Sequence, residues 1–166
     1  LLRMPACAGV IGLGRRSDPP FDLGDETSIA ACARAVAPKG PFELIVDATG
    51  ALHIDGVGPE KRLHDLSADR LSRAFMVNAI GPALLMKHFI PLLPSQSRCM
   101  FATLSARVGS IADNRKGGWY GYRASKAARN MLLRTAAVEA CRQRPEAIFV
   151  ALQPGTVRSR LSAPFA

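Results

Sequence analysis

The sequence predicts an α/β fold in which helices cover a parallel β-sheet. Short, nearly continuous apolar runs alternate along the chain with longer helical patterns. Strands of a parallel sheet are buried on both faces and therefore read as unbroken apolar runs. The 166 residues are 48% hydrophobic, which is enough for one domain with its own core, so we expect a single domain over 1–166.

Four apolar runs are expected to form the strands of this sheet. They are 8–13, 43–48, 98–104 and 147–152. The carboxyl ends of parallel strands form the edge at which such folds bind ligands. The residues after these runs, which we therefore expect at one edge, are Arg15, Arg16, Gly50, Ser105, Pro154 and Gly155.

Two helical patterns occupy the first half of the chain. Asp25 is placed to cap a helix over 26–37, whose apolar residues fall on one stripe. Ser67 begins a second, longer pattern. Within that pattern Gly81 and Pro82 should kink or break the helix, because proline removes a backbone donor and crowds the preceding turn.

Charge and cysteine usage narrow the possible partners. The net charge is +9, but the basic residues are spread along the chain and aromatics make up only 6%, unlike a nucleic-acid-binding stripe. The apolar runs are broken well before the roughly 20 residues that a membrane span needs. The 4 cysteines stand far apart without metal-ligand spacing. We therefore expect no nucleic acid, membrane or metal partner, and a reducing, cytoplasmic compartment.

Tyr122 and Lys126 stand four residues apart in a segment rich in helix formers that ends near Arg142. On a helix this spacing puts both side chains on one face. A nearby ammonium favours the phenolate and should lower the tyrosine pKa from about 10, so the pair could serve as a general acid/base. The spacing alone favours a half-buried aromatic beside a solvated lysine, so the rest of the chain has to decide between the two interpretations.

The order of motifs along the chain resembles the short-chain dehydrogenase/reductase family. The order is strand-ATG, asparagine in a long helix, strand-Ser, Tyr-x-x-x-Lys and strand-Pro-Gly, and it covers nearly the whole chain. The segment SARVGSIADNRKGGWYGYRASKAARNML looks most like the carbonyl-reductase branch that includes sniffer and C-factor. The resemblance implies a Rossmann-like, doubly wound sheet and NAD(P)-dependent oxidoreductase activity on a small carbonyl or alcohol.

The resemblance assigns catalytic roles to four residues. Tyr122 would exchange a proton with the carbonyl oxygen, and Lys126 would lower its pKa and hold the nicotinamide ribose. Asn78 would order a proton-relay water, although it could instead be a helix-kink residue that bonds its own backbone. Ser105 would polarise the substrate carbonyl, but the family's serine aligns with Ala106, so this role requires a small shift.

The resemblance also places the cofactor. Asp47 and the three residues after it match the family's Asn-Asn-Ala-Gly, with only the glycine kept. Arg15 and Arg16 favour NADP(H) over NAD(H), because a guanidinium can pair with the 2′-phosphate; the alternative is a solvated basic loop. The implied cofactor-binding residues are Arg15, Arg16, Asp22, Leu23, Ala48, Thr49, Gly50, Tyr122, Lys126, Pro154, Gly155, Thr156 and Val157.

Compared with the family pattern, we expect the chain to be truncated. The family's first strand, its glycine-rich loop, its lid and its last strand have no counterpart here. We expect the missing first strand to be bypassed by direct pairing of 8–13 with 43–48, and a full-length parent to form a homo-oligomer. Two alternatives stay open at this point: a non-catalytic signalling or interaction protein on the same fold, or an inactive truncated fragment.

Overall fold

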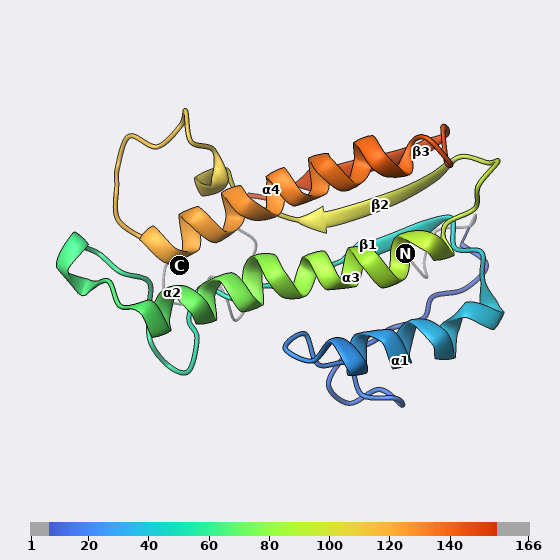
Figure 1. Cartoon of the computed structure of the whole chain (residues 1–166), viewed down its shortest axis with the longest axis horizontal. Coiled ribbons are helices and arrows are strands. Elements are labelled where there is room, and N and C mark those ends of the chain that lie inside the picture. Colours follow the sequence, from blue (N-terminus) through green and yellow to red (C-terminus); the bar gives the residue numbers. More distant parts are fainter. Residues whose placement is uncertain (1–6, 156–166) are drawn as a thin grey trace.

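The computed structural model of the chain describes residues 7–155. Its sheet has three parallel strands in the order β1-β2-β3. Figure 1 shows β1 and β2 side by side. The strands are β1 (Leu44–Asp47), β2 (Cys99–Leu104) and β3 (Ala147–Leu152). The expected α/β class with a parallel sheet is therefore confirmed, and β3 has the predicted bounds.

The register of the sheet aligns the carboxyl ends of its strands. Asp47 of β1 lies opposite Thr103 of β2, and Leu104 lies opposite Leu152 of β3. The segments that follow β1, β2 and β3 thus leave the sheet at one edge. This is the edge at which the sequence places the site.

The α-helices begin where the sequence provides caps. The Asp25 carboxylate accepts a hydrogen bond from the Thr27 amide, and the Ser67 hydroxyl accepts one from the Arg70 amide. The α-helices are α1 (Glu26–Val36), α2 (Ala68–Phe75), α3 (Gly81–Phe89) and α4 (Tyr120–Ala140). Short 3₁₀ turns occupy Ala37–Lys39, Leu63–Asp65, Ile90–Leu92 and Arg107–Gly109.

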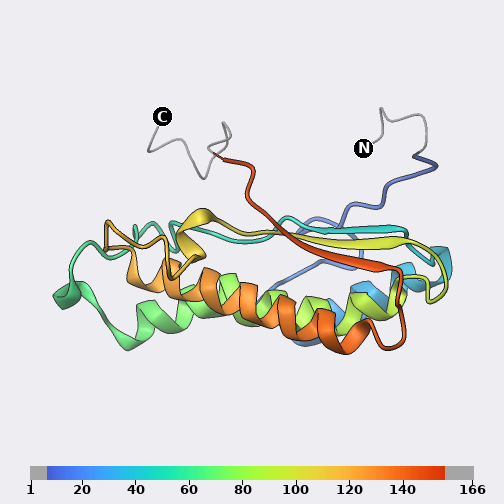
Figure 2. The same ribbon diagram turned by 90° about the horizontal axis from the view of Figure 1, so that it is seen from above.

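The described α-helices all lie on one side of the sheet (Figure 2). The core forms between that face and α1, α3 and α4, with Ile29, Phe89 and Phe101 fully or almost fully buried. The opposite face is not covered by any described helix, and Leu44 and Val46 of β1 are 40% and 44% exposed. The expectation of helices on both faces is thus not met within residues 7–155.

The long helix is not broken at the proline but continues through it, with one wider turn just before it. A π-helical turn, Met76–Ile80, joins α2 to α3 without interruption. Pro82 cannot donate to the carbonyl four residues earlier and would crowd it, and a wider turn accommodates both effects. Gly81 is required by a close approach, because a Cβ there would overlap Leu23.

The run 8–13 does not form a strand, which contradicts the prediction. Val10 and Ile11 are 45% and 41% exposed, and the run does not pair with β1, so the expected closure is also wrong. An apolar run becomes a strand only where a neighbour accepts its backbone hydrogen bonds. Within the described residues, β1 is instead an edge strand.

The continuous helix Ala68–Leu92 is long and apolar enough to cross a membrane by length and composition alone. The core helix of a soluble protein passes the same test. Here the helix packs against α1 and α4, and Leu85, Met86 and Phe89 belong to the core. The criterion is therefore weak evidence for a membrane span.

Candidate active site

Helix α4 carries Tyr122 and Lys126 on its buried face at the carboxyl edge of the sheet. The two residues are 8% and 3% exposed. The Lys126 ammonium donates to the Leu104 carbonyl at the end of β2, at 3.0 Å, and lies 5.6 Å from the centre of the Tyr122 ring. Lys126 is therefore not the solvated neighbour that the spacing alone would allow.

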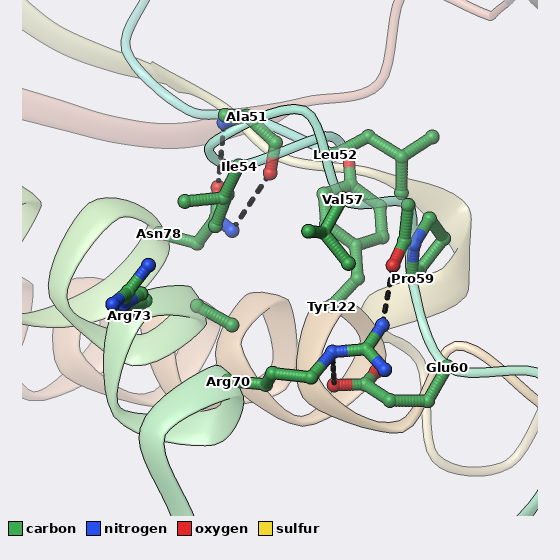
Figure 3. Close-up of a pocket in the computed structure, with 12 residues that line it drawn as sticks. Ala51, Leu52, Ile54, Val57, Pro59, Glu60, Arg70, Arg73, Asn78 and Tyr122 are labelled. Carbon is green, nitrogen blue, oxygen red and sulfur yellow. Dashed lines mark hydrogen bonds and ion pairs between the residues drawn. The ribbon is translucent and has the colours of Figure 1, made fainter. Parts of the chain in front are cut away.

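Asn78 is fully buried in the π-helical turn and bonds across to the loop after β1. Its Oδ1 accepts from the Ala51 amide at 3.0 Å, and its Nδ2 donates to the Ala51 carbonyl at 2.9 Å (Figure 3). The alternative interpretation, in which the side chain bonds the backbone of its own helix, is therefore wrong. Isolated π turns occur frequently at functional sites, because they direct a side chain away from the regular helical path.

Gly50 is the point at which these groups converge. Its φ of +134° is a conformation that L residues rarely adopt. A Cβ at this position would lie 3.0 Å from Asn78 Oδ1, 3.1 Å from Lys126 Nζ and 3.6 Å from a guanidinium nitrogen of Arg129. The glycine retained from the family pattern therefore leaves room for two buried polar groups.

Tyr122 is held from two further directions. The Trp119 ring stands edge-on to the phenol ring, with centroids 6.2 Å apart. The buried Glu60 carboxylate accepts a hydrogen bond from the Gly121 amide at 3.0 Å and so caps the first turn of α4. Both contacts fix the start of the helix that carries Tyr122.

Tyr122 and Asn78 line a small pocket of about 60 Å³ under the loop after β1 (Figure 3). Leu52, Ile54 and Val57 give it an apolar wall. A volume of this size holds a few water molecules, whereas substrate pockets usually measure about 300 to 1,000 Å³. The pocket formed by the described residues is thus too small for a typical substrate.

The electrostatics of the pair differ from the sequence-based expectation. Burial raises the pKa of Tyr122, and the positive charge of Arg129 opposes that effect. Burial and then Arg129 lower the pKa of Lys126 to about 8, against the attraction of Asp47. The expected lowering of the tyrosine pKa is not observed, because desolvation of the phenolate outweighs the nearby positive charge.

A buried polar network beside this pair was not predicted. Arg129 is fully buried one turn after Lys126 and donates to the Asp47 carboxylate, to Thr103 Oγ1 at 2.7 Å and to the Thr49 carbonyl at 2.9 Å. Asp47 also accepts from both hydroxyls, at 2.6 Å from Thr49 and 2.8 Å from Thr103. The signals that could have found it are a strand ending in aspartate and an arginine at helical spacing from Lys126.

Ser105 is not brought to Tyr122. Its hydroxyl donates to Asn130 Oδ1 at 2.6 Å. Asn130 follows Tyr122 by eight residues on α4, which corresponds to about 12 Å along a helix. A carbonyl-polarising role for Ser105 remains a prediction that requires its side chain to turn.

The expected cofactor residues are placed unevenly. Tyr122 and Lys126 are buried, Gly50 and Thr49 are half-buried beside them, and Leu23 packs against Gly81, one turn after Asn78. The others are exposed: Arg15 and Arg16 in a turn that follows no strand, Asp22 beside Gly24, Ala48 after β1, and Pro154 and Gly155 after β3. Thr156 and Val157 lie outside the described residues.

Comparisons with known proteins identify the family of this chain. The sequence profile of the family described as enoyl-(acyl carrier protein) reductase matches residues 12–165. A C-signal protein of Myxococcus xanthus is 33% identical over 126 residues, which are 75% of this chain and 71% of that protein. The chain therefore belongs to the short-chain dehydrogenase/reductase family.

Individual relatives extend the comparison. The 1-hydroxy-2-glutathionyl-2-methyl-3-butene dehydrogenase of Rhodococcus sp. (strain AD45) is 32% identical over 75% of this chain, which spans only 52% of that enzyme. A protein of Burkholderia multivorans described as a short-chain dehydrogenase/reductase and solved with bound NADP superposes with a TM-score of 0.77 at 27% identity, over 89% of this chain and 60% of that one. The carbonyl reductase Sniffer of Caenorhabditis elegans superposes with a TM-score of 0.71 at 25% identity, over 82% of this chain and 62% of that one.

Proposed function

We propose that this protein is an NADP(H)-dependent oxidoreductase that reduces small carbonyl compounds or oxidises the corresponding alcohols. The observation that carries the proposal is the convergence of Lys126 and Asn78 around Gly50 at the carboxyl edge of the sheet, with the Tyr122 ring 5.6 Å from Lys126 Nζ and in the same pocket as Asn78. The NADP-bound relative from Burkholderia multivorans supports the choice of cofactor. Residues 1–166 would act as one NAD(P)-binding domain.

The buried cluster fits a dinucleotide at its nicotinamide end. The space that a Cβ of Gly50 would fill is bordered by Lys126 Nζ, a donor suited to ribose hydroxyls. Arg15 and Arg16 would pair with the 2′-phosphate. The cofactor would supply or accept the hydride.

The residues of the chain would then manage the proton. Tyr122 would donate its phenolic proton to the carbonyl oxygen as negative charge develops there, and would take it back in the reverse direction. Lys126, charged below a pKa of about 8, would stabilise the resulting phenolate. Asn78, held by Ala51, would order a water through which the proton is replaced.

The test is the rate of NADPH oxidation by the purified protein with a panel of aromatic aldehydes. Tyr122→Phe should lower the rate by at least about 100-fold, with unchanged NADPH affinity by calorimetry, because only the proton donor is lost. Tyr120→Phe is the matched control, since Tyr120 is exposed on the same turn. Equal loss in both variants, or no loss in either, would contradict the assignment of Tyr122.

The similarity to C-signal favours one second candidate, a signalling or interaction protein that keeps the fold without turnover. The hydrogen bond that the Ser105 hydroxyl donates to Asn130 agrees with this alternative, because it engages the hydroxyl away from a substrate carbonyl. NADPH binding without aldehyde-dependent oxidation would support it.

A further inference from the structure

The buried pair of Arg129 and Asp47 has no role in the chemistry proposed above. Of the described side chains, Arg129 is the largest that is fully buried. Burial of a charged side chain carries a large desolvation cost unless it is paired and hydrogen-bonded, and an apolar residue would fill such a position as stably. A buried ion pair beside a reactive lysine therefore invites a functional explanation.

The contacts of Arg129 are next to those of Lys126. Arg129 Nε donates to the Thr103 hydroxyl, and Lys126 Nζ donates to the carbonyl of the next residue, Leu104. A further guanidinium nitrogen donates to the Thr49 carbonyl, immediately before Gly50. One side chain thus joins α4 to the carboxyl ends of both β1 and β2.

The charges around Lys126 can be assigned element by element. From α4 it faces Arg129 and Tyr122, and from β1 it faces Asp47. The π-helical turn contributes the neutral Asn78, and β2 contributes a carbonyl. Arg107, on the short turn after β2, is exposed and paired with Asp113.

We propose that Arg129, held by Asp47, is a positioning residue that fixes Lys126 against the Leu104 carbonyl and offsets the attraction of Asp47 for its ammonium. The inference rests on the proposed function, since it assigns Arg129 to the same proton-handling pair. Asp47 attracts the ammonium, Arg129 repels it, and the two are tied to each other. Their removal one at a time should therefore move Lys126 in opposite directions.

The experiment measures the titration of Lys126 by NMR in protein labelled at lysine, with the signal assigned from Lys126→Met. Arg129→Met should raise the pKa of Lys126 by about one unit or more, because a repelling cation is removed. In this variant Asp47 still accepts hydrogen bonds from Thr49 and Thr103, which limits the cost of removing its charged partner. Arg134→Met, which removes an exposed arginine from the same helix, should leave the titration unchanged.

Asp47→Asn should lower the pKa of Lys126 below about 8, and Asp47→Asn/Arg129→Met should return it to or above the wild-type value. Asp47→Asn removes the carboxylate paired with the buried Arg129 charge, and this can prevent folding. In that case the pKa of Lys126 is compared among wild type, Arg129→Met and the double variant. An ordinary lysine pKa in the wild type, or shifts of one sign in both single variants, would overturn the inference. NMR titration needs no turnover, so a failure of the proposed enzymatic function is detected separately.

Discussion

The proposed catalytic side and the proposed cofactor side of this candidate site are built differently. On the catalytic side, Lys126, Asn78 and Gly50 are held by buried side-chain contacts that cross from α4 and the π-helical turn to the ends of β1 and β2. On the cofactor side, Arg15 and Arg16 lie exposed in a turn, without an ion pair to another described residue. Substitutions on the first side should therefore cost folding stability, and those on the second should alter binding alone.

Gly50→Ala should have the largest effect on the catalytic side. A Cβ at φ +134° is strained and would displace Asn78 Oδ1 and Lys126 Nζ, so we expect a loss of about 3 kcal/mol in unfolding free energy together with most of the NADPH affinity. Urea unfolding and calorimetry measure both. Gly56→Ala is the matched control, because its φ is +76° but nothing lies within 4 Å of its Cβ position. Similar losses in the two variants would show that backbone strain, and not the displacement of Asn78 and Lys126, causes the effect of Gly50→Ala.

Lys126 should make the unfolding free energy of the chain depend on pH. Its pKa is lowered to about 8 in the folded chain and is about 10.4 when unfolded, so between these values the unfolded state binds more protons and stability rises with pH. The unfolding free energy of wild type relative to Lys126→Met should grow by about 2 kcal/mol from pH 8 to about pH 10. The exposed Lys116, changed to Met, should produce no such slope. A flat difference for Lys126→Met would mean that its ammonium is solvated.

The smallest effect is expected on the cofactor side. Arg15→Gln/Arg16→Gln should weaken the binding of NADPH roughly tenfold more than that of NADH, a difference of about 1.4 kcal/mol in binding free energy. Only NADPH carries the 2′-phosphate with which the arginines would pair. Unfolding free energy should change by less than about 0.5 kcal/mol. The control is Arg34→Gln/Arg134→Gln, which removes the same charge from exposed helix positions. Equal weakening of both cofactors would identify the pair as a solvated basic turn.

The sequence predicts the elements whose signals are local. Helical spacing placed Tyr122 and Lys126 on one face, the cap at Asp25 and the helix start at Ser67 are correct, and the strand 147–152 has the right bounds. Each of these depends on residues within a few positions of one another. Local patterns therefore carry most of the fold and the central pair of the site.

The errors arise where the outcome depends on distant residues. The run 8–13 is apolar enough for a strand but has no strand neighbour to pair with among the described residues. Arg129 and Asp47 are 82 residues apart, so no local pattern indicates their contact. The pKa of Tyr122 follows burial, which the spacing of Tyr122 and Lys126 does not reveal. Tertiary packing decided each of these features.

Trp119 gives this chain a built-in optical reporter. It is the only tryptophan in the sequence, and its ring centroid lies 6.2 Å from that of Tyr122. Indole emission depends on the polarity and mobility of its immediate surroundings, so the intrinsic fluorescence of the unlabelled chain comes from a position beside the phenol. A nicotinamide or an aldehyde entering next to Tyr122 would change that emission, which allows occupancy of the site to be followed without turnover.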